Sequence, residues 1–372
     1  MPVDNYLLLD IYLRKMIDMP IQATRPAYAG VRLEREALRR LPMMLEDLLD
    51  EPDIGPLQQQ APDNGLDAII NSHGRCWLIE VKSAASPGMV ASVAEQMARL
   101  VPRDGIALLV VPFMTTAGAK AATERDLNWL DLSGNAHIRD KDLYVSIQGR
   151  PNQFAARGRP SSAFAPKSSR ITRALLLDPE RWWRQKEISE NTDLDAGRVS
   201  RVVRRLEDDE LLARNRALLR PRDRDLLLDA WADEYRFDRH DIVAGHLSGS
   251  GIELTRELDH RLRHADVDHA FTGLPAAWAF DRFARFRLNS VYVHGDPRVA
   301  ADAIELRRNE RGANVQLIGP EDRGVFDGQQ DVDELPCVSS VQVYLDLLAL
   351  PERGREAAEE LRHDGAIWHA RP

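Results

Sequence analysis

The sequence predicts a multidomain protein in which an α/β domain, a mainly helical domain and a second α/β domain follow one another. Strand-like apolar runs alternate with amphipathic helical segments in residues 1–147 and again in 238–372, which is the pattern of α/β folds. Residues 168–237 follow a mostly helical pattern. Between the first two regions, residues 148–167 are rich in Gly, Pro, Ser and Arg, a composition typical of a linker.

The composition is that of an ordinary globular protein. The 372 residues are 44% hydrophobic and 29% charged, and they suffice for two or three domains with their own cores. Cys76 and Cys337 match neither the spacing of a zinc site nor a disulfide framework, so a reducing cytoplasm is expected. We expect no signal peptide, because acidic residues interrupt the apolar N-terminal run. We expect no membrane contact, because no apolar segment is long enough to span a bilayer.

Positive charge is concentrated in one segment, although the net charge of the chain is -9. Residues 144–177 contain no acidic residue, and their basic residues are Arg150, Arg157, Arg159, Lys167, Arg170 and Arg173. Such a segment between acidic flanks favours contact with nucleic acid, although a solvated linker would have the same composition. Its stretch ARGRP (156–160) resembles the core of a minor-groove-binding AT-hook, but chance matches are common in linkers of this kind.

The helices and strands of the first domain follow from hydrophobic periodicity. Leucines repeat on one helical face at the start of the domain, and a wholly apolar run near its middle is typical of a central strand. A hairpin-length loop, NSHGR, separates two strand-like runs. The expected elements are a helix in 33–49, strands in 66–70 and 76–82, a helix in 88–101, a strand in 105–113, a helix in 117–130 and an alternating segment in 135–147.

The stretch WLIEVKSA (77–84) combines an apolar strand pattern with two charged side chains. Glu80 and Lys82 are two residues apart, so in a strand they point to the same face. Asp67 opens the preceding strand, and a hairpin of suitable register would bring it beside Glu80. Because Mg²⁺ and Mn²⁺ prefer oxygen ligands, we predict Asp67 and Glu80 as metal ligands. The predicted catalytic residues are Asp67, Glu80, Lys82 and, on the following helix, Gln96.

Other assignments of this site are compatible with the sequence. Asp63 is an alternative first carboxylate, and Glu34 or Glu36 on the first helix could add a ligand. Glu80 and Lys82 could also be a surface ion pair of little energetic weight. The order of acidic residue, hairpin, Glu-x-Lys and helix in residues 30–145 resembles the PD-(D/E)XK nuclease superfamily. That resemblance implies cleavage of DNA with Mg²⁺ or Mn²⁺, although folds of this kind also serve as binding modules.

Residues 184–215, RQKEISENTDLDAGRVSRVVRRLEDDELLARN, predict a short helix, a turn and a second helix. Asp195, at the end of the turn, is a suitable N-cap for the second helix. The apolar face of that helix has helical spacing and consists of Val199, Val202, Val203 and Leu206. The residues off this face are Arg198, Ser200, Arg201, Arg204 and Arg205. An apolar inner face and a basic outer face after a short turn are typical of a recognition helix.

A short hairpin, ELLARNRALLRP, follows with Arg214 and Arg216 at its tip, and RITRALLLDP supplies a helix in front. The whole stretch resembles the winged helix-turn-helix domain of bacterial transcriptional regulators, which implies binding to double-stranded DNA. The residues expected nearest the bases are Arg198, Ser200 and Arg201, and those expected at phosphates are Arg204, Arg205, Arg214 and Arg216. A homodimer is expected, because such proteins commonly read two half-sites. A helical hairpin with solvated arginines is the alternative.

The stretch HAFTGLPAAWAFDRFARFRLNSVYVHG (269–295) resembles the start of a nucleotidyltransferase-like fold. The small-residue turn of that fold is present at Thr272, Gly273 and Ala276. Its paired aspartates are absent, because the following strand reads NSVYV without an Asp-x-Asp. Two-metal nucleotide transfer would therefore lack its ligands, and we expect this domain to bind or contact a partner.

Residues 311–362, which include RGANVQLIGPEDRGVFDG and VQVYLDLLALPERGREAAEELR, are similar, together with the winged helix, to the AbiEi family of type IV toxin–antitoxin antitoxins. The resemblance covers residues 168–365, and WLDLSGNAHI (129–138) also looks like a segment of longer members of this group. It implies a DNA-binding antitoxin that represses its own operon, with a cognate toxin as partner. Tyr344, Asp346 and Arg353 are expected at a functional surface, although Tyr344 also fits a buried helix stripe.

Two functions are therefore compatible with the sequence. The first is a sequence-specific, antitoxin-like transcriptional regulator. The second is a Mg²⁺-dependent DNA endonuclease, acting in phage defence and directed to DNA by its winged helix. The N-terminal domain departs from the short antitoxin pattern, and the presence of Asp67, Glu80 and Lys82 keeps the enzyme hypothesis open. A nuclease joined to a regulator module would need restraint in its own cell, so regulation is the first hypothesis.

Overall fold

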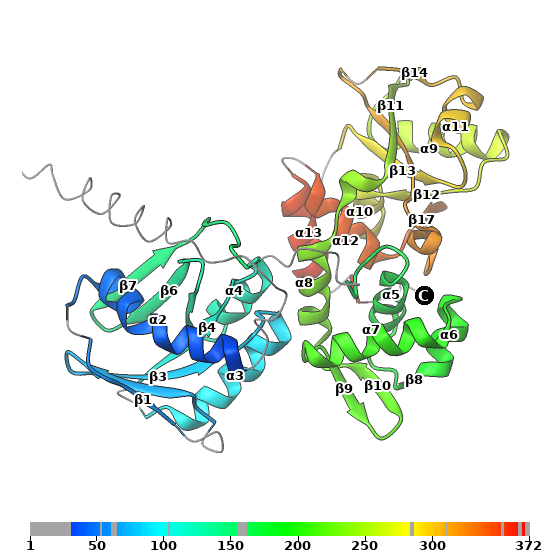
Figure 1. The fold of residues 1–372 in the computed structure, drawn as a ribbon. Coiled ribbons are helices and arrows are strands. Elements are labelled where there is room, and N and C mark those ends of the chain that lie inside the picture. The colour runs from blue at the N-terminus through cyan, green and yellow to red at the C-terminus, as the bar shows by residue number, and fades with distance from the viewer. Residues whose placement is uncertain are drawn as a thin grey trace, which may run out of the picture.

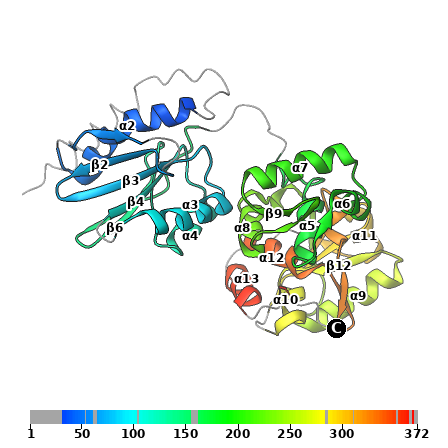
Figure 2. The same cartoon turned by 90° about the horizontal axis from the view of Figure 1, so that it is seen from below.

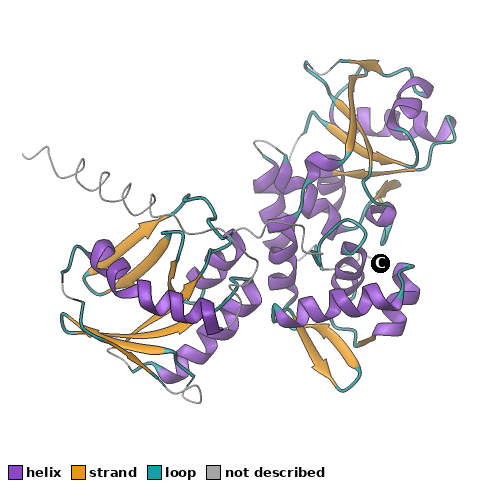
Figure 3. Ribbon diagram, viewed as in Figure 1, coloured by secondary structure: helices purple, strands orange, loops and turns teal. Residues whose placement is uncertain are grey.

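A computed structural model describes the chain at residues 31–52, 54–60, 65–102, 105–154, 162–282, 286–309, 311–350, 353–363 and 367–368. Within these residues the chain forms three sheets and many helices in a multidomain, mixed α/β arrangement, as the sequence predicts. Figure 1 traces it from the N-terminal domain in blue and cyan to the C-terminal helices in red, and Figure 3 separates helices from strands by colour. None of the helices in these ranges is long and apolar enough to cross a bilayer.

The N-terminal domain is built on a seven-stranded sheet whose strands lie in chain order. Its three central strands run parallel to one another, and the outer strands pair antiparallel. The strands are β1 (Leu57–Gln59), β2 (Ala68–Ser72), β3 (Arg75–Val81), β4 (Gly105–Val111), β5 (Asn128–Asp131), β6 (Ala136–Asp140) and β7 (Leu143–Ile147). Parallel central strands need crossover connections, and helices supply them.

Helices cover both faces of this sheet (Figure 2). The helix α2 (Val31–Leu49) packs on one face, where Ile79 and Val81 of β3 share a core with its leucines. The helices α3 (Pro87–Leu100) and α4 (Thr116–Thr123) cover the other face, where Leu78 joins their core. Because alternate residues of a strand point to opposite faces, Glu80 lies on the face of α3.

Two expected boundaries in this domain are wrong. The β2–β3 hairpin closes through two residues, His73 and Gly74, both with positive φ (49° and 75°), so NSHGR is mostly strand. A two-residue turn with φ positive at both positions matches the twist of the flanking strands. The helix expected in 117–130 ends at Thr123, because Asn128–Asp131 forms the buried strand β5.

The central region consists of helices around a small three-stranded sheet of order β8-β10-β9. Its elements are α5 (Ser169–Leu177), β8 (Trp183–Arg184), α6 (Gln185–Thr192), α7 (Ala196–Asp208), β9 (Leu212–Asn215), β10 (Leu218–Pro221) and α8 (Arg224–Glu234). The two-residue connection between β9 and β10 makes them a tight hairpin, which projects beside α7 in Figure 1. The helices and the hairpin fall where the sequence predicts them.

The C-terminal region holds a second seven-stranded sheet, of mixed direction and order β14-β11-β15-β13-β12-β17-β16. Its strands are β11 (Asp241–His246), β12 (His269–Thr272), β13 (Asn289–Val293), β14 (Arg307–Arg308), β15 (Val315–Gly319), β16 (Gln330–Val332) and β17 (Leu335–Cys337). Its helices are η2 (Phe237–Arg239), α9 (Gly251–His264), α10 (Gly273–Asp281), α11 (Pro297–Ala303), η3 (Arg323–Phe326), α12 (Ser340–Ala349) and α13 (Gly354–His363). Helices and strands alternate, as expected.

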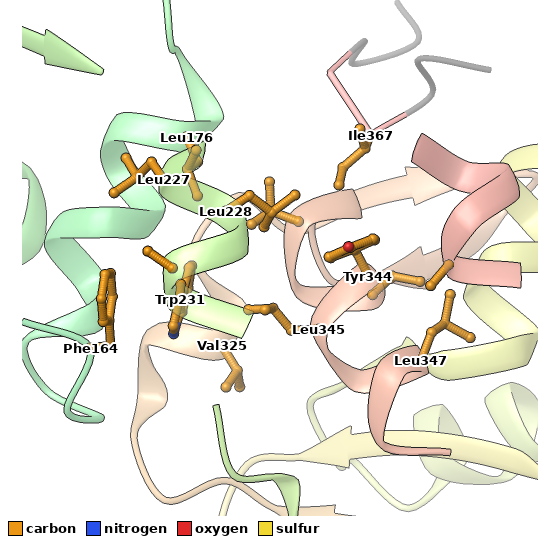
Figure 4. Packing of buried hydrophobic residues seen from close by; sticks show 14 of the residues in the cluster. Phe164, Leu176, Leu227, Leu228, Trp231, Val325, Tyr344, Leu345, Leu347 and Ile367 are labelled. Carbon is orange, nitrogen blue, oxygen red and sulfur yellow. The ribbon is translucent and has the colours of Figure 1, made fainter. Parts of the chain in front are cut away.

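The helix α8 joins the central and C-terminal regions through a shared apolar core (Figure 4). Trp231 of α8 is buried, with Phe164 on one side and Leu345 of α12 on the other. Phe164 and Ala163 lie within residues 148–167, which the sequence indicates as a linker, yet both are buried. The end of this segment is therefore part of the packed core, because its apolar side chains cover α8.

The N-terminal domain contacts the central region where α3 begins and α7 ends. Ser86 is the N-cap of α3, and its Oγ donates a hydrogen bond of 2.8 Å to the backbone oxygen of Asp209, the C-cap of α7. A Cβ atom on Gly88, in the first turn of α3, would lie 2.6 Å from the Glu210 carbonyl oxygen. The N-terminus of α3, the positive end of its dipole, thus lies against the C-terminus of α7, the negative end of its dipole. The two backbones approach so closely that only glycine fits at position 88.

A second contact joins α4 to α8 and, through α8, to α13. The Asp233 carboxylate accepts a hydrogen bond of 2.7 Å from the backbone N–H of Ala117 in the first turn of α4. Asp229 pairs with Lys120 of α4 at 3.1 Å and with Arg362 of α13 at 2.5 Å. One carboxylate on α8 therefore binds cations from the N-terminal and C-terminal domains together.

Candidate functional site

The structure brings Asp67 and Glu80 together as the sequence predicts. Ala68 pairs with Ile79 in the β2–β3 ladder, and continuing this register by one residue places Asp67 opposite Glu80. The backbone N–H of Asp67 donates to the Ile79 oxygen at 2.9 Å, which extends the ladder to that pair. The Asp67 Oδ2 atom accepts a hydrogen bond of 2.7 Å from the backbone N–H of Val81. Both carboxylates therefore lie where β3 ends.

Glu80 is buried, and its carboxylate is only partly satisfied. Its residue exposure is 4%, and its Oε1 atom accepts a hydrogen bond of 2.5 Å from the Nζ of Lys82. Its Oε2 atom is buried without a hydrogen-bond partner among the described residues. Burial raises the pKa of Glu80, the Lys82 ammonium lowers it, and the nearby Asp67 carboxylate raises it further. Gln96 also lowers this pKa, while its amide donates to the Gly65 oxygen.

The residues fit a divalent cation only in part. Two carboxylates and an unpartnered buried oxygen suit a hard cation such as Mg²⁺, which commonly keeps several waters beside one or two carboxylates. Within the described ranges no group of three or more His, Cys, Asp or Glu is arranged to hold a metal ion. Glu36 pairs with Arg39 at 2.8 Å, on the helix α2 that covers the face opposite Glu80. Asp63 lies outside the described residues.

The helix α7 has the amphipathic form that the sequence predicts. Asp195 is its N-cap and accepts a hydrogen bond of 2.8 Å from the backbone N–H of Arg198, which lowers the pKa of Asp195. The predicted apolar face is buried and consists of Val199, Val202, Val203 and Leu206. The exposed residues on the outer side are Ser200, Arg201, Arg204 and Arg205. A continuous polar and cationic surface therefore faces away from the core.

Not all of the predicted DNA-contacting arginines are equally available. Arg205 pairs with Asp209 at 2.9 Å, Arg214 with Glu207 at 2.5 Å and Arg198 with Asp195 at 3.8 Å. Three others, Arg201, Arg204 and Arg216, form no ion pair with any described residue. Arg216 occupies the hairpin turn with a φ of 55°. The predicted contact residues that form no ion pair with a described residue therefore lie along α7 and at the hairpin tip.

The basic segment 144–177 is not a continuous surface for nucleic acid. Arg170 is buried and pairs with Asp322 at 2.6 Å. Arg173 is also buried, and its Nη2 donates to the Gln342 side chain. A count of the charges in this segment does not reveal that Arg170 and Arg173 are buried, because their partners lie far away in the sequence. The ARGRP stretch lies outside the described residues.

The functional surface expected at Tyr344, Asp346 and Arg353 is wrong for two of these three residues. Tyr344 and Asp346 are buried, and only Arg353 is exposed, where it pairs with Glu356 at 3.7 Å. The helix stripe considered for Tyr344 is the correct interpretation, and its hydroxyl accepts a hydrogen bond of 3.1 Å from Arg362. The strand NSVYV is β13, a fully buried strand.

Asp346 is instead the centre of a buried polar network that the sequence did not reveal. Thr272 donates to its Oδ2 atom at 2.5 Å. Its Oδ1 atom accepts hydrogen bonds from Tyr235 at 2.5 Å, Tyr292 at 3.1 Å and Gln342 at 2.8 Å. Burial raises the pKa of Asp346 to about 6, although these four donors lower it. The one local feature of the sequence that indicates this network is the pair of polar residues Gln342 and Asp346, four apart on the otherwise apolar helix α12.

Comparison with known proteins supports one of the expected resemblances. Residues 220–367, from β10 through the C-terminal domain to α13, match the model of a family described as "Transcriptional regulator, AbiEi antitoxin, Type IV TA system". This match covers the C-terminal part of the resemblance and neither α5 to α7 nor the N-terminal domain. No curated protein and no solved structure matches the chain.

Proposed function

We propose that the protein is a sequence-specific, DNA-binding transcriptional regulator of the antitoxin type. The observation that carries this proposal is the surface of α7, where the apolar face is buried and Arg201 and Arg204 are exposed without ion-pair partners among the described residues. The family match of residues 220–367 supports the antitoxin part. A cognate toxin is the expected protein partner, its operon the expected target and a homodimer the expected assembly.

Fluorescence anisotropy with the DNA upstream of the protein's own gene tests this proposal. We expect specific binding that exceeds binding to unrelated DNA by at least about a thousandfold at physiological salt. Arg201→Gln should weaken it by about 1–3 kcal/mol and relax the sequence preference, whereas Arg204→Gln should weaken binding to all sequences alike. Arg355→Gln is the matched control, because Arg355 is exposed on α13, far along the chain from α7. Equal affinity for both DNAs would exclude a sequence-specific regulator.

A second function, a metal-dependent DNA endonuclease, is supported by the unpartnered Oε2 atom of Glu80. Asp67 and Glu80 would hold Mg²⁺ or Mn²⁺, which would supply a water activated for attack on a phosphodiester. Lys82, which donates a hydrogen bond to Glu80, would orient that water, and Gln96 borders the same carboxylate.

The contact between α3 and α7 supports a common DNA substrate for the two functions. Ser86, which bonds to the end of α7, follows Glu80 by only six residues. An extended chain spans at most about 3.6 Å per residue, so Glu80 lies within about 25 Å of the end of the recognition helix. Because Arg198 lies about 17 Å along α7 from that end, cuts by this site would fall within about two helical turns of the DNA that α7 contacts.

Calorimetric titration with Mn²⁺ and cleavage of plasmid DNA test the second function together. Wild-type protein should bind Mn²⁺ and cut DNA, and Glu80→Gln should lose both. The matched control is Glu36→Gln, because Glu36 is a carboxylate on the opposite face of the sheet. Arg201→Gln should keep Mn²⁺ binding while its specific DNA binding weakens, which separates the two functions. Cleavage that persists in Glu80→Gln and Lys82→Gln would identify a contaminating nuclease.

A further inference from the structure

The N-terminal domain binds the C-terminal end of the helix α7 through the first turn of α3. The Ser86 hydroxyl donates a hydrogen bond of 2.8 Å to the Asp209 backbone oxygen. As the N-cap of α3, the same hydroxyl accepts a hydrogen bond of 3.3 Å from the backbone N–H of Met89. A hydroxyl has one hydrogen to donate and two lone pairs that accept, so it can serve both partners at once. One side chain therefore begins α3 and binds the end of α7.

The backbones of α3 and α7 also meet directly at this point. A Cβ atom on Gly88 would lie 2.6 Å from the Glu210 oxygen and 2.7 Å from the Asp209 oxygen. Both oxygens belong to the backbone, so they cannot move aside as the end of a flexible side chain could. Glu210, which follows the C-cap of α7, has a φ of 55° and turns the chain out of the helix. The contact therefore leaves α7 little room to shift while the two domains stay together.

The N-terminal domain also binds the helix α8, through the first turn of α4. Thr115, the N-cap of α4, donates a hydrogen bond of 2.9 Å to the backbone oxygen of Ala85, the residue before Ser86. The backbone N–H of Ala117, in that first turn, donates a hydrogen bond of 2.7 Å to the carboxylate of Asp233 on α8. Figures 1 and 2 both show α3 and α4 beside α8. A series of hydrogen bonds thus connects α7 to α8 through the N-terminal domain.

This connection bears on the two arginines that carry the proposed DNA contact. Arg201 and Arg204 lie on the outer face of α7, a helix of 13 residues and therefore about 20 Å long. In so short a helix, a shift of the C-terminal end tilts the whole outer face. Hydrogen bonds to base edges require defined distances and angles, so such a tilt weakens base contacts first.

We propose that Ser86 and Gly88 are positioning residues for DNA recognition, through which the N-terminal domain sets the orientation of α7. This role rests on the DNA-binding function proposed above and requires neither a metal ion nor cleavage. In this role the N-terminal domain affects DNA affinity and sequence preference through α7, without a DNA contact of its own. The coupling is a difference in free energy between the docked and the undocked arrangement, typically equivalent to a five- to 150-fold change in affinity.

Two substitutions separate the contact with α7 from the stability of α3. Ser86→Asp keeps an N-cap acceptor, because aspartate caps helices about as well as serine, but its carboxylate has no hydrogen to donate to the Asp209 oxygen. Gly88→Ala favours the helix α3, because glycine loses more backbone entropy, but places a Cβ atom against the end of α7. Ser86→Thr keeps the hydroxyl and is the conservative variant. Ser146→Asp, at an exposed position on β7, is the matched control for the added negative charge.

Fluorescence anisotropy of the full chain, with the DNA upstream of its own gene and with unrelated DNA, measures the effect. Ser86→Asp and Gly88→Ala should each weaken specific binding by about five- to twentyfold and reduce the preference for the upstream DNA. Ser86→Thr and Ser146→Asp should stay within about twofold of the wild type. Urea unfolding should give the N-terminal domain of Ser86→Asp a midpoint close to that of the wild type, because the cap is kept.

The outcomes separate the positioning role from the regulator itself. If the wild type prefers its upstream DNA while Ser86→Asp and Gly88→Ala bind that DNA with wild-type affinity, the positioning role is overturned and the regulator stands. An equal loss in Ser146→Asp and Ser86→Asp would also overturn it, because the added charge alone would explain the loss. If the wild type binds both DNAs equally, the regulator is excluded and the positioning role with it. If Gly88→Ala fails to fold, the affinity of Ser86→Asp decides alone.

Discussion

Two buried carboxylates, Glu80 in the N-terminal domain and Asp346 in the C-terminal domain, differ in how many hydrogen bonds they accept. Both belong to otherwise apolar elements, and burial raises the pKa of both. Asp346 receives four hydrogen bonds, from residues of β12, α12, β13 and the end of α8. Glu80 receives one from Lys82, and its second oxygen has no partner among the described residues.

This difference distinguishes a carboxylate that holds the fold together from one with unused binding capacity. A fully satisfied buried network specifies one arrangement of the elements that contribute to it. A half-satisfied carboxylate stabilises little by itself and remains available to a ligand. The two residues should therefore respond in opposite ways to substitution, and four measurements compare them.

The largest effect is expected for Asp346→Ala. The substitution removes the acceptor of four hydrogen bonds and leaves buried donors on Thr272 and Tyr292 unsatisfied. The free energy of unfolding of the C-terminal domain should fall by about 3–5 kcal/mol. Native-state hydrogen exchange of the β13 amides measures this loss. Glu359→Ala, on the exposed side of α13, should change the same quantity by less than about 0.5 kcal/mol. A loss below about 1 kcal/mol for Asp346→Ala would contradict a structural role.

The pH dependence of stability should reveal a second feature of the Asp346 network. Burial, aided by the Arg173 charge, lowers the pKa of His240 from 6.5 to about 4, so its contribution to stability is lost as the pH falls through this range. The pKa of Asp346 is raised from 3.8 to about 6, so its contribution grows as the pH falls from 6 to 3.8. Because the two groups oppose each other, their combined contribution to the stability of the wild type should change little between pH 7 and 5.

His240→Gln removes the contribution of His240 to this pH dependence and leaves that of Asp346. Between pH 7 and 5, the free energy of unfolding of His240→Gln should rise by about 2 kcal/mol relative to wild type. Urea unfolding at several pH values, followed by fluorescence, measures the difference. His246→Gln, at an exposed position on β11, should follow the wild type. The same pH dependence in His240→Gln and wild type would mean that His240 is not buried in its neutral form.

The contrast between the two carboxylates also explains what the sequence could predict. The pairing of Asp67 with Glu80 follows from a hairpin, in which a short connection fixes which residues lie opposite each other. The α6–turn–α7 unit is local in the same sense, since the N-cap Asp195 and the apolar spacing lie within one short stretch. Local patterns of this kind set both the position and the orientation of the side chains, so both arrangements could be predicted from the sequence.

The Asp346 network could not be predicted because its members are distant in the sequence. Tyr235 and Thr272 precede Asp346 by more than seventy residues and belong to different elements. The sequence places Arg173 in a basic segment, since no local feature shows that it packs against Trp231 and Gln342. The pattern of residues 117–130 predicts a helix where the structure has strand β5, because a short apolar run fits either structure until its place in a sheet is known.

A smaller effect is expected for Lys82→Met, which removes the cation of the Lys82–Glu80 pair. Lys82 donates a hydrogen bond of 2.5 Å to the Glu80 carboxylate and is its only cationic partner among the described residues, and its side chain is 30% exposed. Removing it leaves the buried carboxylate without a counter-ion, which should destabilise the N-terminal domain by about 1–2 kcal/mol. Urea unfolding measures the change. The matched control is Lys186→Met, because Lys186 is exposed on α6. Lys120 is unsuitable as a control, because it pairs with Asp229.

The smallest effect, and the sharpest contrast with Asp346→Ala, is expected for Glu80→Met. The substitution removes a buried oxygen that has no partner, and Lys82 can extend its ammonium into solvent because its side chain is partly exposed. The free energy of unfolding should stay the same or rise by up to about 1 kcal/mol, since an apolar residue of similar volume commonly replaces a buried charge without loss. In the double variant Glu80→Met/Lys82→Met the cost of Lys82→Met should disappear, because no buried carboxylate remains to be neutralised. If the free energy of unfolding fell by more than about 2 kcal/mol in Glu80→Met, Glu80 would stabilise the fold as Asp346 does, and the contrast between the two residues would be wrong.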